Sequence, residues 1–469
     1  MIVTAPVVVW FRHDFRLADN AALTAAVETG APVLCIHILD DAAGQVAARW
    51  WLGRALESFD AALRPLGGGL HVFHGPAIRV LPAVVAATGA RAVFWNRRYD
   101  PEGRETDTRL KAMLKERGTP AHSFAGALLH EPWTVRTRMG QPYHVFGAYW
   151  RAACQMGHER PPLPAPERIA FATPDPAGLP PTVEVGAIGR EMRATGWTAG
   201  LEEAWMPGEA AAQEALEQFL DGLLEDYARD RDFPARPATS GLSPFLCWGH
   251  ITPAQIRQAV VARPHAAGLA KFMAELGWRD FAWSVLFACP DLLSRNLRPE
   301  FDAMAWRRDR EGLRAWQRGR TGYPLVDAGM RQLWRTGWMH NRVRMVAASF
   351  LVKHLLIDWR EGERWFARTL VDYDPASNGM NWQWVAGTGV EAAPFFRMMN
   401  PLIQSRKFDP SGAYIRAWVP ELAGLSDTQI HAPWLAGGVA GYPAPIVVHE
   451  AARERALAAW RALGGPADG

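Results

Sequence analysis

Short apolar runs alternate with amphipathic segments over residues 1–130, and this alternation limits the fold more than any other feature of the sequence. The apolar runs, rich in β-branched and aromatic residues, lie at 7–10, 33–39, 70–73, 92–95 and 122–124. Segments with helical periodicity separate them, at 21–28, 45–63, 77–87 and 103–116. Such alternation is typical of repeated βαβ units with right-handed crossovers. It predicts a parallel, five-stranded, doubly wound sheet with helices on both faces.

The phosphate-binding signatures of common nucleotide enzymes are missing from this part of the sequence. No GxGxxG follows the first apolar run, and no GxxxxGK[ST] occurs. The first pattern lets the backbone approach a pyrophosphate, and the second cradles a nucleoside triphosphate. The sequence therefore does not support an NAD-dependent or an NTP-dependent enzyme.

The pattern changes after the predicted sheet. Eight prolines between residues 161 and 181 indicate a long connection. Beyond it, Pro207 and Glu209 stand where a helix would begin, and apolar residues then recur at helical spacing to about residue 371. We predict an α/β domain over 1–130, an interdomain linker over 131–205 and a mostly α-helical domain over 206–469.

The apolar segments and the cysteines exclude several protein classes. The first apolar run meets Arg12, Asp14 and Arg16 at once, unlike a secretory signal. The most apolar helical stretch, 345–357, is interrupted by Lys353 and His354 and is too short to span a bilayer. We therefore expect a cytoplasmic protein without a membrane segment. The cysteines, at 35, 154, 247 and 289, form no CxxC pattern and predict neither a disulfide framework nor a metal site.

Residues that carry chemistry are densest between positions 275 and 384. Glu275, Trp278 and Arg279 are spaced i, i+3 and i+4, which puts them on one face of a helix. A structural ion pair within the helix, beside a core tryptophan, has the same spacing. The residues alone therefore leave both a functional site and a structural ion pair open. Two further polar sets follow along the chain: Asn341, Arg344 and Met345, then Asp372, Asp374 and Asn378. The last set lacks the glycine and terminal glutamate of an EF-hand, so we do not predict a calcium site.

Tryptophan and arginine are both in excess. The chain has 22 Trp among 469 residues, and 46 of its 51 basic residues are Arg. Packing alone does not need so much indole, so stacking or electron transfer is an alternative to a Trp-rich core. Between residues 307 and 344, ten Arg stand against three acids, a local balance of +7 in a chain of net charge +3. This balance favours a phosphate-binding surface over an ordinary solvated face.

Five long segments resemble the photolyase/cryptochrome family, and together they extend over essentially the whole chain. They read VVWFRHDFRLADNAAL from residue 8, TSGLSPFLCWGHITP from 239, ELGWRDF from 275, TGWMHNRVRMVAASFLVKHLLIDWREGERWF from 336 and NWQWVAGTGVEAAPFFRMMNP from 381. Motifs of this length and order are far more specific than a short pattern. The resemblance implies an N-terminal α/β domain, a linker and a helical C-terminal domain that holds FAD.

Position by position, the resemblance implies a set of FAD-binding residues: Tyr227, Thr239, Ser240, Leu242, Ser243, Arg279, Asn341, Arg344, Asp372, Asp374 and Asn378. The Thr-Ser pair at a predicted helix start agrees with phosphate binding, although a plain helix cap uses the same residues. Asn378 matches the residue that faces flavin N5. An asparagine at this position resembles the photolyase type.

The resemblance also implies a lesion pocket that contains Glu275, Trp278, Asn341, Met345 and Trp384. Arg231 is a further predicted substrate-binding residue, and it suits a phosphate of the DNA. Glu275, Asn341, Met345 and Asn378 are the predicted catalytic residues. Indoles and a methionine suit the apolar rings of a cyclobutane pyrimidine dimer, while Glu275 and Asn341 can hydrogen-bond its polar edges. A 6-4 photolyase would have His in place of Met345. The tryptophans that match the family's electron-transfer triad are Trp306, Trp359 and Trp382.

The expected function is light-driven repair of cyclobutane pyrimidine dimers by electron transfer from excited, reduced FAD. We expect a monomer that binds UV-damaged duplex DNA and flips the dimer out. A blue-light-sensing cryptochrome, a 6-4 photolyase and a flavin-containing nucleic-acid binder without repair activity are the alternatives. A second, antenna chromophore occurs in such proteins, but its identity stays open. Gly103 stands where the folate-binding glutamate often occurs, with Glu102 and Glu105 nearby.

Overall fold

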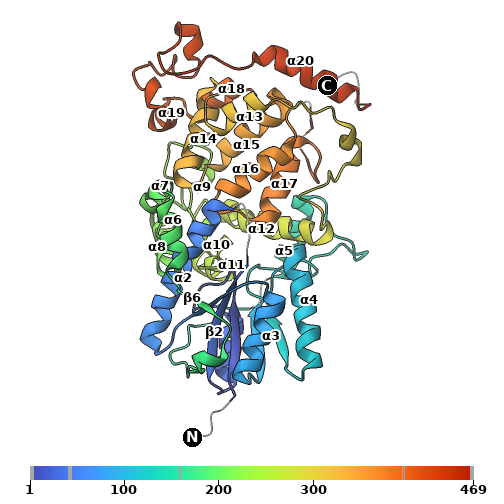
Figure 1. The fold of residues 1–469 in the computed structure, drawn as a ribbon. Helices are drawn as coiled ribbons and strands as arrows, with labels where there is room; N and C mark the ends of the chain where they lie inside the picture. Colours follow the sequence, from blue (N-terminus) through green and yellow to red (C-terminus); the bar gives the residue numbers. More distant parts are fainter. Residues whose placement is uncertain (1–4, 41–44, 158–159, 393, 396, 465–469) are drawn as a thin grey trace.

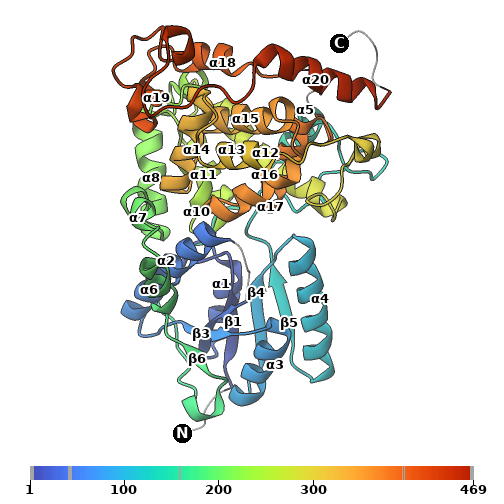
Figure 2. The ribbon, with the colours of Figure 1, turned by 45° about the horizontal axis from the view of Figure 1, so that its top comes forward.

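The computed structural model describes residues 5–40, 45–157, 160–392, 394–395 and 397–464. An α/β domain forms one end of the molecule and a helical domain forms the other (Figure 1). The helices α6–α8 run along one side between them, and α20, near the C-terminus, lies at the far end of the helical domain (Figures 1 and 2).

The sheet has six strands in the order β5-β4-β1-β2-β3-β6. Five are parallel, as predicted, and they are β1 (Val7–Phe11), β2 (Val33–Leu39), β3 (His71–His74), β4 (Ala92–Asn96) and β5 (Ala121–Phe124). The sixth, β6 (Thr182–Val183), pairs antiparallel with β3 and was not predicted. It is only two residues long and follows a proline-rich stretch, so it carries no periodic signal.

Both faces of the sheet are buried. Val7, Val9 and Phe11 of β1 belong to the core on one face, together with residues of α1 (Ala21–Glu28) and α2 (Val46–Leu63). Val8 and Trp10 belong to the core on the other face, with α3 (Ala77–Thr88) and α4 (Pro101–Glu116). Alternate residues of one strand thus enter different cores, which explains why the strand sequences show no polar alternation.

The rest of the chain is mostly helical. Its first helices are α5 (Phe146–Met156), α6 (Ala187–Ala194), α7 (Ala199–Ala204), α8 (Glu209–Gly222), α9 (Tyr227–Asp230), α10 (Ser243–Cys247), α11 (Pro253–Val261) and α12 (Leu269–Ala288). Then come α13 (Arg310–Gln317), α14 (Pro324–Thr336), α15 (Asn341–Ser349), a π-helix (Phe350–His354), α16 (Trp359–Thr369), α17 (Pro375–Ala386), α18 (Pro401–Phe408), α19 (Ala413–Trp418) and α20 (His449–Arg461). The domain division at residues 130 and 205 stays a prediction.

The two domains share a core. Trp51 of α2 packs edge-on against Phe245 of α10, and its Nε1 donates to Nε2 of His250 at 3.0 Å. Arg16, which is buried in the α/β domain, donates to the carbonyl oxygen of Gly249 at 2.9 Å. These contacts fix the domain interface beside the candidate site. Among the described residues, no helix is long and apolar enough to cross a membrane.

Candidate active site

Three packed helices carry nine of the predicted site residues. α12 contributes Glu275, Trp278 and Arg279, and it packs against α17. The other two helices contribute Asn341, Arg344 and Met345 from α15, and Asn378, Trp382 and Trp384 from α17. α15 also packs against α17, so the structure brings the three sequence sets to neighbouring helices.

Asp372 is the centre of a hydrogen-bonded cluster at the start of the loop before α17. Asp372 is buried. Its Oδ2 lies 2.8 Å from Nη2 of Arg344 and accepts a hydrogen bond from Oγ of Ser243 at 2.7 Å. Nε of Arg344 donates to the carbonyl oxygen of Met339, and Nε1 of Trp338 donates to Ser243 Oγ at 3.3 Å. A buried carboxylate is stable here because a guanidinium and a hydroxyl satisfy it.

Asp374 begins α17 and faces α12. Its Oδ1 accepts from the backbone N–H of Ser377, so it is the N-cap, and Pro375 occupies the first helical position. Its Oδ2 accepts from Nε1 of Trp283 at 2.9 Å and lies 3.8 Å from Nε of Arg279. Arg279 also donates to the carbonyl oxygen of Ala127 in the preceding domain. Asp374 therefore links the helix start to the domain interface.

Asn378 is held by Glu363, a residue that the sequence analysis missed. Nδ2 of Asn378 donates to Oε1 of Glu363 at 3.0 Å, and the hydroxyl of Tyr373 donates to the same oxygen at 3.0 Å. Burial raises the pKa of Glu363. No sequence signal marks this residue, because it stands among three other charges in WREGER, a pattern typical of an exposed helix face.

The predicted phosphate-binding segment follows α9 and leads into α10. Tyr227 and Leu242 are buried, whereas Thr239 and Ser240 are partly exposed. Gly241, between them, has φ +64°, and no atom lies within 4 Å of the position that a Cβ would take. The segment thus offers hydroxyl groups next to open space.

The structure pairs two predicted substrate residues with each other. Arg231 forms a hydrogen-bonded ion pair with Glu275, and its guanidinium lies over the ring of Tyr227. Nζ of Lys271, one turn earlier in α12, lies 3.1 Å from Glu275 Oε1. The sequence predicts Arg231 and Glu275 as separate contacts, since nothing in the spacing of residues 231 and 275 indicates that they meet.

The remaining predicted substrate residues are partly or fully exposed. Asn341 is exposed, and Met345 and Trp384 are partly exposed. Trp278 stacks on Phe146 of α5, with ring centroids 3.7 Å apart. No ring contact joins Trp278 to Trp384 among the residues that the structure describes.

Comparisons with known proteins agree with this geometry. Family models match residues 7–167 as DNA photolyase and residues 272–462 as the FAD binding domain of DNA photolyase. The deoxyribodipyrimidine photo-lyase of Agrobacterium fabrum is 47% identical, with 98% of each chain covered. The chain belongs to the photolyase/cryptochrome family. Cryptochrome-1 of Arabidopsis thaliana, also a relative, is 36% identical over 96% of this chain and 69% of its own length.

Solved structures of photolyases have the same fold. A bacterial class III photolyase from Agrobacterium tumefaciens superposes with a TM-score of 0.94 at 46% identity, covering 99% of this chain and 98% of that one. An archaeal photolyase from Sulfolobus tokodaii, described with two FAD molecules, has a TM-score of 0.85 at 30% identity, covering 97% of this chain and 100% of that one. The predicted fold class is confirmed.

The residues present fit the FAD that this family binds. The hydroxyl groups of Thr239 and Ser240, beside the open space at Gly241, suit phosphates. The Arg344–Asp372 pair and Asp374 supply one cation and two carboxylates, whose oxygens would accept hydrogen bonds from hydroxyl and N–H groups of a bound FAD. The individual residue assignments stay predictions.

The predicted electron-transfer tryptophans differ in burial. Trp382 and Trp359 are fully buried, and Trp306 is partly exposed. Trp359 donates from Nε1 to Oδ1 of Asn296 at 2.9 Å. Among the described residues, the ring of Trp382 contacts Phe366, with centroids 5.0 Å apart, and Trp316, with centroids 6.3 Å apart. Trp316 was not among the predicted electron-transfer residues.

Ion pairs reduce the predicted basic surface between residues 307 and 344. Five of its ten arginines lie within 4 Å of a carboxylate oxygen: Arg307, Arg331, Arg335, Arg342 and Arg344. The other five, which are exposed, lie in or next to α13: Arg308, Arg310, Arg314, Arg318 and Arg320. The positive charge is thus concentrated around one short helix.

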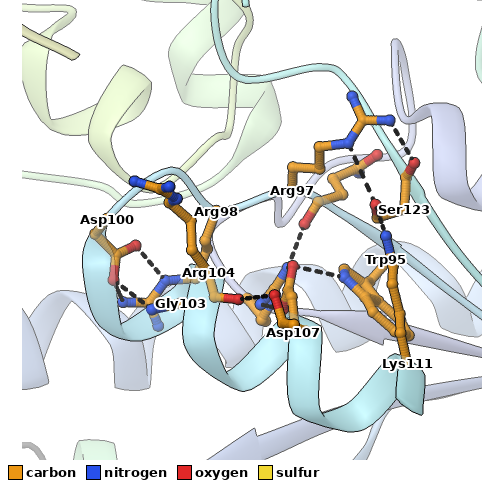
Figure 3. A network of polar contacts seen from close by, with 12 residues as sticks. Trp95, Arg97, Arg98, Asp100, Gly103, Arg104, Asp107, Lys111 and Ser123 are labelled. Carbon is orange, nitrogen blue, oxygen red and sulfur yellow. Dashed lines mark hydrogen bonds and ion pairs between the residues drawn. The ribbon is translucent and has the colours of Figure 1, made fainter. Parts of the chain in front are cut away.

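A cavity lies where the α/β domain meets the helical domain. Its walls include Arg12, Arg98, Tyr99, Trp283 and Asp374. The first three follow β1 and β4, at the carboxyl ends of the strands where the strand order reverses. Arg98 is ion-paired with Asp100, and a Cβ on Gly103 would lie only 2.6 Å from Arg98 Cβ (Figure 3). Position 103 therefore leaves no room for the glutamate side chain that often occurs there.

Proposed function

We propose that this chain is a light-driven DNA repair enzyme that splits cyclobutane pyrimidine dimers. One observation carries the proposal: every predicted lesion residue except Arg231 lies on the packed helices α12, α15 and α17, which also carry the predicted FAD-binding residues Arg279, Arg344 and Asn378. An electron donor and its acceptor held there would be close together. Bound FAD, when reduced and excited by light, supplies one electron to the dimer and takes it back after the ring has opened.

The chain's own residues bind and orient the lesion in this proposal. Trp384 and Met345 offer apolar contact to the flipped dimer, and Asn341 offers an amide to its edge. Glu275 exchanges its partner Arg231 for the dimer, and its hydrogen bond strengthens as negative charge develops on the pyrimidine. Arg231 is then released to contact a phosphate.

Asn378 is oriented by its neighbour. Because Glu363 accepts from Nδ2 of Asn378, the amide oxygen is the end left to face the site. A carbonyl oxygen accepts a hydrogen bond from an N–H group and cannot donate a proton. This arrangement favours a cofactor that keeps its ring N–H and returns its electron.

Lesion choice tests the proposal. Purified protein would be irradiated with one duplex that contains a cyclobutane thymine dimer and another that contains a 6-4 photoproduct, and restored bases would be counted. We expect restoration of the first lesion alone. Restoration of the 6-4 lesion alone would establish that alternative. Loss of neither lesion would favour a cryptochrome or a non-repairing binder. Size-exclusion chromatography of the same sample tests the predicted monomer, and fractionation of cells tests the predicted cytoplasmic location.

We also propose that the interdomain cavity receives an antenna chromophore. Arginines at the carboxyl ends of β1 and β4 suit an anionic ligand, and Tyr99 and Trp283 suit a planar one. The absorption spectrum of the purified protein should show a second pigment beside flavin. Arg98→Ala should lose that pigment and keep the flavin; loss of both, or of neither, would contradict this placement.

A further inference from the structure

A row of aromatic side chains leads from the proposed cofactor site to the surface without using the predicted triad. Trp283 donates to Asp374, one of the predicted FAD-binding residues. Its ring centroid lies 6.2 Å from that of Tyr99, and Tyr99 lies 6.0 Å from Trp133. Tyr99 is buried, whereas Trp133 is 42% exposed. The row crosses the domain interface, from α12 to the loops that follow β4 and β5.

The central residue of this row has a proton acceptor. The hydroxyl of Tyr99 donates a short hydrogen bond to Glu131. Glu131 is ion-paired with Arg97 at 2.7 Å, so the acceptor is a carboxylate. A tyrosine loses an electron far more readily when its phenolic proton can move to a base at the same time. Burial and this neighbouring carboxylate raise the pKa of Tyr99, so the proton stays on the phenol until oxidation.

The charges around the row favour an electron vacancy, or hole, on Trp283 or Tyr99 over one on the exposed Trp133. Asp374, which accepts from Trp283, favours positive charge on that indole, while Arg279, 3.8 Å from the same carboxylate oxygen, offsets part of the effect. The guanidinium of Arg97, 5.9 Å from the ring centroid of Trp133, disfavours positive charge there. The hole would therefore rest on Tyr99, which becomes neutral by giving its proton to Glu131.

We propose that Trp283, Tyr99 and Trp133 form a second electron-donor route that reduces the oxidised, light-excited cofactor, with Tyr99 as a proton-coupled relay. Trp283 gives up one electron, Tyr99 refills it and passes its proton to Glu131, and the tyrosyl radical is left. A thiolate in solution, reaching Trp133, supplies the replacing electron and becomes a thiyl radical, and Glu131 returns its proton to Tyr99. The inference rests on the proposed function, because it needs a bound FAD.

The test uses the FAD-loaded protein with the triad blocked by Trp382→Phe. We expect slow photoreduction to persist in this variant in the presence of a thiol, and Tyr99→Phe added to it should remove most of that remainder. Tyr143→Phe is the matched control, because Tyr143 packs on Tyr149, outside the row. Freeze-trapped samples should give the EPR signal of a neutral tyrosyl radical that shifts with ring-deuterated tyrosine and is absent after Tyr99→Phe. Glu131→Gln, which keeps a hydrogen-bond acceptor but takes no proton, should slow its formation.

Three outcomes would overturn the route. They are complete loss of photoreduction in Trp382→Phe, an unchanged rate after adding Tyr99→Phe, and a tyrosyl signal that survives Tyr99→Phe. Failure of the proposed function looks different: chemically reduced wild-type protein would not restore dimers. The route acts only on the oxidised cofactor, so chemically reduced protein does not need it and tests the repair function alone.

Discussion

Glu363 is a buried carboxyl that positions two other polar side chains of the site, and its titration should be visible in stability. Burial raises its pKa in the folded chain above the unfolded value. The folded state therefore prefers the protonated form, and stability falls as pH rises through the folded pKa. Its two hydrogen-bond donors, Tyr373 and Asn378, need only an acceptor, which Gln also offers.

Glu363→Gln should therefore melt at about the wild-type temperature near pH 4 and at a higher temperature than wild type near pH 8, since only wild type carries a buried charge there. Thermal melts of both proteins across this range measure the gap. Glu361→Gln, at a partly exposed position of the same helix, serves as the control. A melting-temperature difference between wild type and Glu363→Gln that does not change with pH would show that Glu363 does not titrate in this way.

Trp384 carries the second residue-scale prediction. Its indole is partly exposed on α17, where a flipped base can stack on it. Trp384→Ala should weaken dark binding of a dimer-containing duplex by ~1–3 kcal/mol, the value typical of one base-aromatic stack. Flavin absorption checks that FAD stays bound. Trp460→Ala, on α20 and outside the three site helices, should bind like wild type, and equal losses in both variants would remove the stacking role.

At the scale of elements, α16 and α17 meet where Gly362 faces Trp382. A Cβ on Gly362 would lie 2.1 Å from Cη2 of Trp382, whose ring is fully buried. Gly362→Ala gains about 1 kcal/mol from helix propensity, but it overpacks the core at a cost of ~1–3 kcal/mol. We therefore expect the free energy of unfolding to fall. Gly222→Ala, in α8 with no atom within 4 Å, should stabilise. Urea unfolding compares them, and stabilisation by both variants would disprove the tight contact.

The five parallel strands were predictable because each is a β-branched run bounded by a helical segment. Predicted and observed ends differ by one residue at most, and 33–39 agrees at both ends. The two-residue β6 was not predictable, since it is defined by its two residue pairs with β3 and not by a pattern of its own. The π-helix at Phe350–His354 was also hidden within an apolar stretch that reads as an ordinary helix. Tertiary contacts determine both features.

In the candidate site too, features within one helix were predictable and contacts between segments were not. Intrahelical spacing and family motifs predicted the residues on α12, α15 and α17. The contacts that join distant segments, Arg231 with Glu275 and Asn378 with Glu363, depend on the packing of separate helices. Spacing along one helix holds no information about such pairs.

At the scale of the whole molecule, Gly249 lets the two domains approach. It has φ +62°, and a Cβ there would lie 2.1 Å from the carbonyl oxygen of His13 in the other domain. Gly30 has a similar φ of +69° but open space around it. Gly30→Ala should lower the free energy of unfolding by only ~1–2 kcal/mol, the cost of a left-handed backbone in a residue with a Cβ. Gly249→Ala should lower it by more and loosen the interface between the two domains. Hydrogen exchange of residues 13–16 and denaturant unfolding test this, and equal costs would contradict it.

The central claim is that the chain uses light to return dimers to pyrimidines without net oxidation or reduction. The most direct measurement takes protein with chemically reduced FAD, removes oxygen and excess reductant, and counts dimers restored per protein molecule in light and in darkness. The account predicts many restored dimers per protein in light and none in darkness, because each electron returns. At most one dimer per protein, or restoration in the dark, would contradict it.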